Sequence, residues 1–176
     1  AVTDLHAGGI FLHGRSQAGA AAVAALVGSF TSADADGIPI WVSTDQEGGE
    51  VQVLTGPGFD DIPYAIRQAD LPDDQLRASA TTWGQQLAAA GVTLNLAPVV
   101  DIVTSEATRF DNPPVGALGR QYGYDEATVV AKAGAFADGM RASDVMPVFK
   151  HFPGLGHVAA NTDTTANVVD TTVTAD

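Results

Sequence analysis

The strongest chemical signal in the sequence is a lysine beside a histidine, Lys150 and His151, which open the stretch KHFPG. Both residues follow a short apolar segment, where a strand flares into a loop and neighbouring side chains can reach the same ligand. Lysine is scarce, because only Lys132 accompanies Lys150 in the chain, so solubility explains it poorly. A core histidine bonded to the backbone is the alternative for His151. The position at a strand end favours ligand binding.

Three further candidates follow other apolar segments. Asp45 opens the stretch DQEGG, whose glycines allow a ligand to approach the backbone closely. A capped turn with solvated acids explains Asp45 equally well. Arg120 offers parallel donors for hydroxyl groups or a carboxylate, and a structural salt bridge to Asp45 or Asp101 is an equal alternative. For Asp101, the residues alone favour an acid that caps the following loop and binds backbone amides.

The last stretch of the chain, 150–176, is polar and shows no clear periodicity. Asp163 lies in it, and a carboxylic acid on a mobile loop could act as a general acid and base. An ordinary turn is the simpler interpretation of Asn161 and Asp163 when the residues are taken alone. The sequence contains no spacing typical of metal ligands, so we expect no metal and no other cofactor.

Short apolar segments alternate with longer helical patterns along the chain. Strands are predicted at 9–13, 38–44, 92–100 and 146–149, and helices at 17–30, 71–90 and 125–141. Ser16 and Asp125 are the expected helix caps. The alternation predicts an α/β fold with a parallel sheet, either a (β/α)8 barrel or a doubly wound sheet. Long polar loops, 45–71 and 101–124, follow strand ends, which favours the barrel. Four strands make half of such a barrel.

The composition restricts the partners that the protein can have. The 176 residues include 21 acidic and 8 basic side chains, for a formal net charge of −13. This charge argues against nucleic acid and against anionic lipid as partners. With 45% hydrophobic residues the chain can form a core, and no apolar run reaches the length of a membrane span. Cysteine is absent, which excludes a thiolate nucleophile in these residues.

Five ordered blocks of the sequence resemble glycoside hydrolase family 3, and specifically its β-N-acetylglucosaminidase branch. The blocks are HAGGIFL from His6, DQEGGEVQ from Asp45, NLAPVVD from Asn95, GRQYG from Gly119 and KHFPGLG from Lys150. The resemblance covers nearly the whole chain. It implies that residues 1–176 are an incomplete N-terminal (β/α)8 barrel domain of about four consecutive β/α units, with a flexible catalytic loop at about 150–170.

The resemblance also implies roles for the candidate residues. A set of polar side chains at strand ends would bind the substrate sugar: Asp45, Asp101, Arg120, Lys150 and His151. The family is retaining, which implies an Asp nucleophile that forms a covalent glycosyl-enzyme. By the resemblance this nucleophile belongs on a later strand, beyond Asp176.

In that branch of the family the general acid/base is a histidine in a D-S-H triplet, which falls here on Asn161, Thr162 and Asp163. Asp163 therefore stands in place of the histidine and Asn161 in place of its partner acid, while Leu155 replaces the middle histidine of G-H-G. We expect Asp163 to be a substitute acid/base that Asn161 orients. A loop that has lost catalysis and only binds is the alternative.

The implied function is retaining hydrolysis of terminal β-linked N-acetylglucosamine from cell-wall or chitin-type glycans. A β-glucosidase-type member of the family and a non-catalytic carbohydrate-binding homologue are the alternatives. The expected partner is a small glycan. We expect these residues alone to be inactive and to associate with the remainder of the protein, because half a barrel exposes sheet edges. The acidic composition favours an exported protein over a cytoplasmic one.

Overall fold

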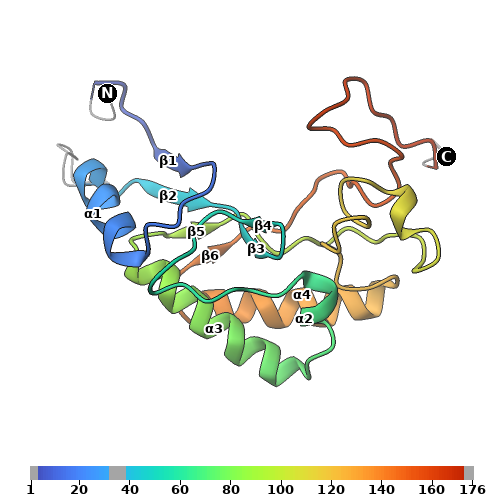
Figure 1. Ribbon diagram of the computed structural model, residues 1–176, viewed down its shortest axis with the longest axis horizontal. Helices are drawn as coiled ribbons and strands as arrows, with labels where there is room; N and C mark the ends of the chain where they lie inside the picture. Colours follow the sequence, from blue (N-terminus) through green and yellow to red (C-terminus); the bar gives the residue numbers. More distant parts are fainter. Residues whose placement is uncertain (1–3, 32–38, 173–176) are drawn as a thin grey trace.

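The computed structural model describes residues 4–31 and 39–172 and contains a four-stranded parallel sheet (Figure 1). The sheet has the order β1-β2-β5-β6, so strands that are neighbours in the sheet also follow one another along the chain, apart from a small hairpin. Every pairing in it is parallel. Its strands are β1 (Gly9–Leu12), β2 (Trp41–Thr44), β5 (Leu94–Asn95) and β6 (Met146–Pro147).

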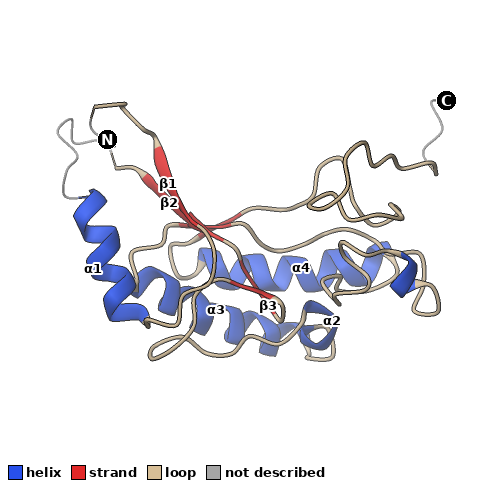
Figure 2. Ribbon diagram, turned by 45° about the horizontal axis from the view of Figure 1, so that its top comes forward, coloured by secondary structure: helices blue, strands red, loops and turns tan. Residues whose placement is uncertain are grey.

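Three long helices connect these strands: α1 (Ala20–Thr31), α3 (Asp73–Ala89) and α4 (Glu126–Arg141). Figure 2 shows all three on the same side of the strands. A doubly wound sheet would carry helices on both faces and would reverse its strand order. The consecutive order and the one-sided helices instead define part of a (β/α)8 barrel, as predicted from the sequence.

The core lies where α3 and α4 pack against each other and against the sheet. Gly139 allows this close approach, because an added Cβ would lie 2.6 Å from both the Ala80 Cβ and the Arg77 carbonyl oxygen. The largest core side chains here are fully buried: Leu76, Leu87, Phe136 and Met140. Burying one such side chain contributes about 1.5–3 kcal/mol, so this helix pair is a rigid base for the loops above it.

The prediction that 45–71 is only a loop was wrong. This segment contains a hairpin, β3 (Gln46–Gly48) paired with β4 (Val51–Gln52), and a short helix, α2 (Ala65–Gln68). Gly48 ends β3 with a φ of 110° and Gly49 begins the turn with a φ of 57°, values that glycine adopts readily. The buried Gln46 fixes the hairpin by donating to the Leu54 carbonyl oxygen and accepting from the Leu54 amide, at 2.8 and 3.0 Å.

Several element boundaries also differ from the predictions. The first helix begins at Ala20, because Ser16 pairs with Leu54 in an isolated bridge instead of capping the helix. The predicted strands 92–100 and 146–149 shorten to two residues each, and a further bridge joins Val99 to Lys150. A 3-10 turn, η1 (Arg109–Asp111), interrupts the loop 101–124.

Other expectations hold. Helix α3 fits the predicted 71–90, and α4 begins after the predicted cap, since Asp125 accepts from the Thr128 amide at 2.9 Å. Position 38, predicted as the start of the second strand, lies outside the described residues. Within 4–31 and 39–172, no helix combines the length and apolar character that crossing a bilayer requires.

Candidate active site

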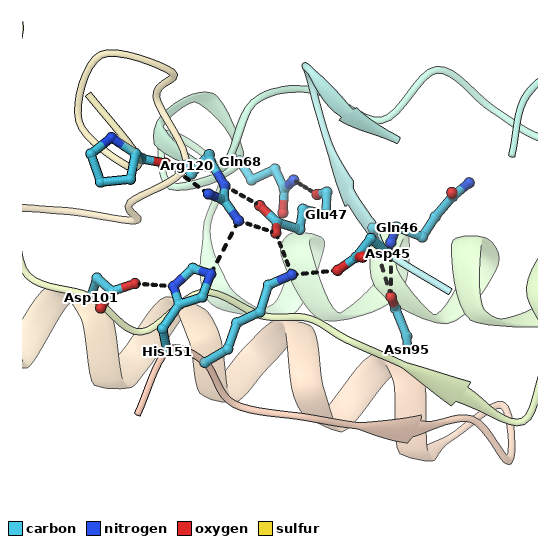
Figure 3. A network of polar contacts seen from close by, with 10 residues as sticks. Asp45, Gln46, Glu47, Gln68, Asn95, Asp101, Arg120 and His151 are labelled. Carbon is cyan, nitrogen blue, oxygen red and sulfur yellow. Dashed lines mark hydrogen bonds and ion pairs between the residues drawn. The ribbon is translucent and has the colours of Figure 1, made fainter. Parts of the chain in front are cut away.

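A cluster of charged side chains lies at the carboxyl ends of the parallel strands (Figure 3). Asp45 directly follows β2, and Glu47 lies in the hairpin behind it. Arg120 comes from the loop after β5, and Lys150 and His151 follow β6. Parallel strands place their carboxyl ends at one edge of a sheet, so residues far apart in sequence meet here.

Glu47 is the centre of this cluster. Its Oε2 accepts from Arg120 Nε at 2.9 Å and its Oε1 from Arg120 Nη2 at 2.7 Å, a bidentate pair. Lys150 Nζ lies 2.6 Å from Glu47 Oε1 and 2.5 Å from Asp45 Oδ1, so it bridges the two carboxylates. Together these four residues form the Glu47 cluster.

The electrostatics keep Glu47 ionised. The side chain is only 4% exposed, and this burial alone would raise its pKa. The hydrogen bonds and charges of Arg120 and Lys150 outweigh burial, so the pKa of Glu47 lies below its ordinary value of 4.5. For Arg120, burial acts to lower the pKa, but the Glu47 carboxylate reverses this effect and the net pKa is raised. Both partners therefore stay charged at neutral pH.

His151 is held between Arg120 and Asp101. Its Nδ1 lies 2.5 Å from Asp101 Oδ2, and its Nε2 lies 3.3 Å from Arg120 Nη2. A guanidinium can only donate, so Nε2 acts as the acceptor and the ring proton sits on Nδ1, where it is donated to Asp101. The hydrogen-bond network thereby assigns a neutral tautomer to His151.

Asp101 lies behind His151. Its side chain is 1% exposed, and its second oxygen, Oδ1, accepts from the Leu155 amide at 2.6 Å. The residue binds a backbone amide, as expected from the sequence, but that amide belongs to the segment after His151, residues 152–172, here called the closing segment, and not to the loop that directly follows Asp101. Asp101 therefore ties the His151 ring to the backbone of Leu155.

Sequence reasoning missed Glu47 as a site residue. Arg120 forms its salt bridge with Glu47. The alternative considered from the sequence, a salt bridge to Asp45 or Asp101, named the wrong partner. A signal was present, because Asp45 and Glu47 are two residues apart and side chains with that spacing share a face of a strand. Because 45–71 was predicted to be a loop, the strand spacing of these two carboxylates was not recognised.

Two buried polar residues, Gln68 and Tyr122, fix the position of the Glu47 backbone. Gln68 Nε2 donates to the Glu47 carbonyl oxygen at 2.8 Å and to the Pro63 carbonyl oxygen at 2.7 Å. Tyr122 donates its hydroxyl proton to Gln68 Oε1 at 2.9 Å. Burial, reinforced by the negative charge of Glu47, raises the pKa of Tyr122 well above its ordinary value. Tyr122 therefore remains protonated and donates to Gln68, which in turn contacts the Glu47 carbonyl oxygen.

A pocket of about 680 Å3 lies beside His151. Lys150, His151 and Asp101 line one wall, and the closing segment contributes His157 and Thr172. His157 Nδ1 lies 2.9 Å from Thr172 Oγ1. This pocket joins the cluster to the closing segment, and it has the size of a small-ligand site.

The two predicted catalytic residues lie apart from this network. The Asp163 amide donates to Asn161 Oδ1 at 2.9 Å, so the asparagine contacts the backbone of Asp163 and not its carboxylate. The Asn161 carbonyl oxygen accepts from the Thr164 and Thr165 amides, and Asp163 is exposed. Figure 1 shows this closing segment, in red, extending away from the sheet.

The cluster is not suited to a metal ion, because Arg120 and Lys150 already balance the charges of Asp45 and Glu47. In the described parts of the chain, no group of three or more histidine, aspartate or glutamate side chains could hold a metal. The cluster instead offers alternating donors and acceptors within a small space. Such an arrangement suits a ligand that carries several hydroxyl groups.

Part of a (β/α)8 barrel with a polar site at the carboxyl ends of its strands defines the class of protein: a barrel domain of the kind that carries enzyme active sites. The family model described as "Glycosyl hydrolase family 3 N terminal domain" matches residues 1–175. The chain belongs to this family.

Relatives and solved structures agree with that assignment. The chain is 36% identical to Beta-hexosaminidase LpqI of Mycobacterium tuberculosis over 164 residues, which cover 88% of this chain and 38% of the relative. It superimposes on the crystal structure of a beta-N-acetylhexosaminidase from Beutenbergia cavernae with a TM-score of 0.97 and 56% identity, over 100% of this chain and 53% of that one. A protein of Arthroderma benhamiae named "Uncharacterized secreted glycosyl hydrolase" is 33% identical over 121 residues, 69% of this chain and 33% of that protein. The chain thus spans about a third to a half of the length of these proteins.

Proposed function

We propose that the complete protein is a retaining glycoside hydrolase that removes terminal β-linked N-acetylglucosamine from cell-wall or chitin-type glycans. The observation that carries the proposal is the Glu47 cluster together with His151. These side chains alternate hydrogen-bond donors with acceptors at the strand ends where barrel enzymes bind substrates. The names of the beta-hexosaminidase relatives support the choice of sugar.

In this proposal the cluster binds the terminal sugar. Asp45 accepts from sugar hydroxyl groups, while Arg120 and Lys150 donate to them. The side chains of Asp45, Lys150 and Arg120 are 24%, 15% and 12% exposed, so each keeps some surface for a ligand. Glu47 fixes both cations from behind. A hydrogen bond to a charged group contributes about 1.5–3 kcal/mol, and several of them give a sugar-specific site.

His151 takes a supporting part in the same site. Its neutral imidazole is held by Asp101 through Nδ1 and faces Arg120 through Nε2. A sugar hydroxyl that approaches between His151 and Arg120 finds both an acceptor and a donor. Asp101 acts through His151 as a positioning residue.

The chemical step needs an acid/base and a nucleophile. We propose Asp163 as the acid that protonates the leaving oxygen and, once the sugar is bound covalently, as the base that activates water. Asn161 stabilises the turn that carries Asp163. The nucleophilic Asp is proposed to lie on a later barrel strand outside these residues, and the segment at about 150–170 to be the catalytic loop.

The remaining strands would complete the barrel. Within the described residues, β1 and β6 are the two outer strands of the sheet, so further strands can pair with them. The Beutenbergia cavernae structure extends beyond the region that this chain matches, which supports this proposal. The name of the secreted Arthroderma benhamiae relative supports an exported location.

The test is an assay of the complete protein with two aryl substrates, the β-N-acetylglucosaminide and the β-glucoside of 4-nitrophenol. We expect the glucosaminide to be cleaved at a kcat/KM at least tenfold higher, and NMR to show a β-configured product. A preference for the glucoside would favour the β-glucosidase-type alternative. Binding of N-acetylglucosamine without turnover of either compound would identify a non-catalytic homologue and reject the proposal.

A further inference from the structure

The closing segment contains a fixed stem, residues 155–158. The side-chain NH2 group of the buried Asn112, in the loop after β5, donates to the Leu155 carbonyl oxygen at 2.7 Å and to the Val158 carbonyl oxygen at 2.9 Å. Gly156 packs so closely on the backbone of the same loop that no room is left for a Cβ, and Val158 is buried. The stem therefore has a defined position relative to the sheet and to the site at its edge.

The residues that follow the stem have no such anchor. Among the described residues, every hydrogen bond that 159–169 form stays within that range, as when the Asn161 carbonyl oxygen accepts from the Thr164 and Thr165 amides. Most of these residues, Asp163 included, are exposed. A local turn fixes its own shape and not its distance from the sugar site, so the position of Asp163 depends on where the chain returns.

The chain returns to the stem through a hydrogen-bonded chain of three side chains, here called the clasp. His157 Nδ1 lies 2.9 Å from Thr172 Oγ1, which lies 2.6 Å from Asp170 Oδ1. A carboxylate only accepts, so the single hydroxyl proton of Thr172 goes to Asp170 and the hydroxyl oxygen accepts from His157 Nδ1. The distance of 2.6 Å is that of a charge-assisted bond. The Thr172 amide donates to the same Asp170 oxygen at 2.8 Å.

The clasp closes the exposed part of the closing segment into a loop (Figure 1). Its two ends, His157 and Thr172, are 15 positions apart in the sequence and are in direct contact, as in the compact surface loops of 6–16 residues. All three clasp residues line the pocket beside His151. A loop with both ends fixed samples fewer positions than a chain held at one end only, so the clasp limits where Asp163 can lie.

We propose that His157, Thr172 and Asp170 are positioning residues, which hold the base of the loop that carries Asp163 against the pocket beside the sugar site. This inference rests on the proposed function and deepens it. The clasp fixes the base of the loop and leaves the turn at Asp163 free to move locally. Because the Glu47 cluster has its own partners, loss of the clasp acts on the proton-transfer step and not on sugar binding.

The test measures kcat and KM of the complete protein with the 4-nitrophenyl glucosaminide. Thr172→Val removes the hydroxyl group and keeps the shape of the side chain. We expect its kcat to fall about tenfold with an unchanged KM, since misplacing a reacting group slows the chemical step. Thr172→Ser restores the hydroxyl group and should recover most of this loss. The matched control is Thr171→Val, because Thr171 is exposed and its hydroxyl makes no hydrogen bond among the described residues.

A double-mutant cycle tests whether His157 acts through Thr172. If the two residues share one contact, His157→Phe and the double variant with Thr172→Val should each lose about as much kcat as Thr172→Val alone. Losses that multiply would show independent roles. A loss in His157→Phe far greater than in Thr172→Val would make His157 itself the group that transfers the proton. Either outcome overturns the inference, as does a Thr172→Val enzyme as active as the Thr171→Val control.

Hydrogen exchange of the backbone amides in 159–169 separates this inference from the proposed function, because it needs no turnover. These amides should exchange about tenfold faster in Thr172→Val than in the wild type or in Thr172→Ser, the effect of losing one hydrogen bond of ordinary strength. If the wild-type protein does not cleave the glucosaminide, the proposed function fails, and exchange alone decides whether the clasp holds the loop. Faster exchange in Thr172→Val supports the clasp, and identical exchange in all of these proteins rejects it.

Discussion

The Glu47 cluster and the turn of the closing segment that carries Asp163 differ in the kind of contact that holds them. In the cluster, each charged side chain contacts residues from another part of the chain, as when Lys150 meets Asp45 across 105 positions of sequence. In the closing segment, Asp163 contacts a neighbour two positions away. A site held by long-range contacts is preorganised, whereas one held by local turns can move. In the proposed function, this difference separates a fixed sugar-binding site from a movable acid/base.

The largest effect is expected for Asp163→Asn in the complete protein. If Asp163 transfers the proton, kcat should fall roughly 10²–10⁴-fold, while the free energy of unfolding changes little because the side chain is exposed. Kinetics with the 4-nitrophenyl glucosaminide and denaturant unfolding measure the two quantities. Asp144→Asn, at an exposed position after α4, is the control. Full turnover in Asp163→Asn would remove the acid/base from this residue.

Glu47→Gln should lower the free energy of unfolding, which Asp163→Asn is expected to leave nearly unchanged. The change leaves Arg120 and Lys150 near one another without their shared anion, and breaking a buried pair costs about 3–5 kcal/mol. Denaturant unfolding measures this loss. Glu106→Gln, at an exposed position, removes the same charge and should leave stability unchanged. A Glu47→Gln protein as stable as the wild type would show that the cluster does not hold the loops together.

The pH dependence of the same pair sharpens this prediction. The pKa of Glu47 is depressed in the folded state, so its contribution to stability is present above its ordinary value of 4.5 and is lost as pH falls through the folded pKa. The stability difference between wild type and Glu47→Gln should therefore be constant near neutrality and shrink in acid. A difference that is the same at pH 7 and at pH 3 would contradict the assignment of an ionised Glu47.

A smaller effect, about 1.5–3 kcal/mol in sugar binding, is expected for Asp101→Asn. Asp101 accepts from His151 Nδ1 with one oxygen and from the Leu155 amide with the other. Asparagine has only one side-chain oxygen, and its NH2 group cannot accept, so one of these two hydrogen bonds is lost. The loss of one charge-assisted hydrogen bond frees His151. Calorimetry with N-acetylglucosamine measures the affinity, with the exposed Asp111→Asn as control. Unchanged affinity would mean that His151 needs no positioning carboxylate.

The smallest effect is expected for Tyr122→Phe. The change leaves Gln68 Oε1 without its donor in a buried position, which costs about 1–3 kcal/mol. Thermal unfolding should detect the loss, and sugar affinity should fall only slightly because Glu47 keeps its own partners. The exposed Tyr64→Phe variant is the control for stability. A larger loss of affinity than of stability would indicate that Tyr122 positions the hairpin for binding.

The sequence predicted the architecture well, because apolar strands and capped helices are local patterns. Asp125 and the α3 region illustrate this success. The hairpin at Gln46–Gln52 was missed, since its polar and glycine residues carry no apolar alternation. Its stability comes from long-range bonds, such as the Gln46 amide to Asn95 Oδ1 at 3.0 Å. The pairing of Arg120 with Glu47 spans 73 positions, and such pairings depend on topology that local patterns do not encode.

The ion pair between Lys150 and Asp45 joins two segments that are far apart in sequence, so the complete binding site exists only in the folded chain. A ligand that needs both residues can bind only when the segments after β2 and β6 have come together, so it binds the folded chain and not the unfolded one. By mass action, such a ligand at 100 times its Kd stabilises the folded state by about 2.7 kcal/mol. A rise in melting temperature can therefore rank candidate sugars before any reaction has been observed.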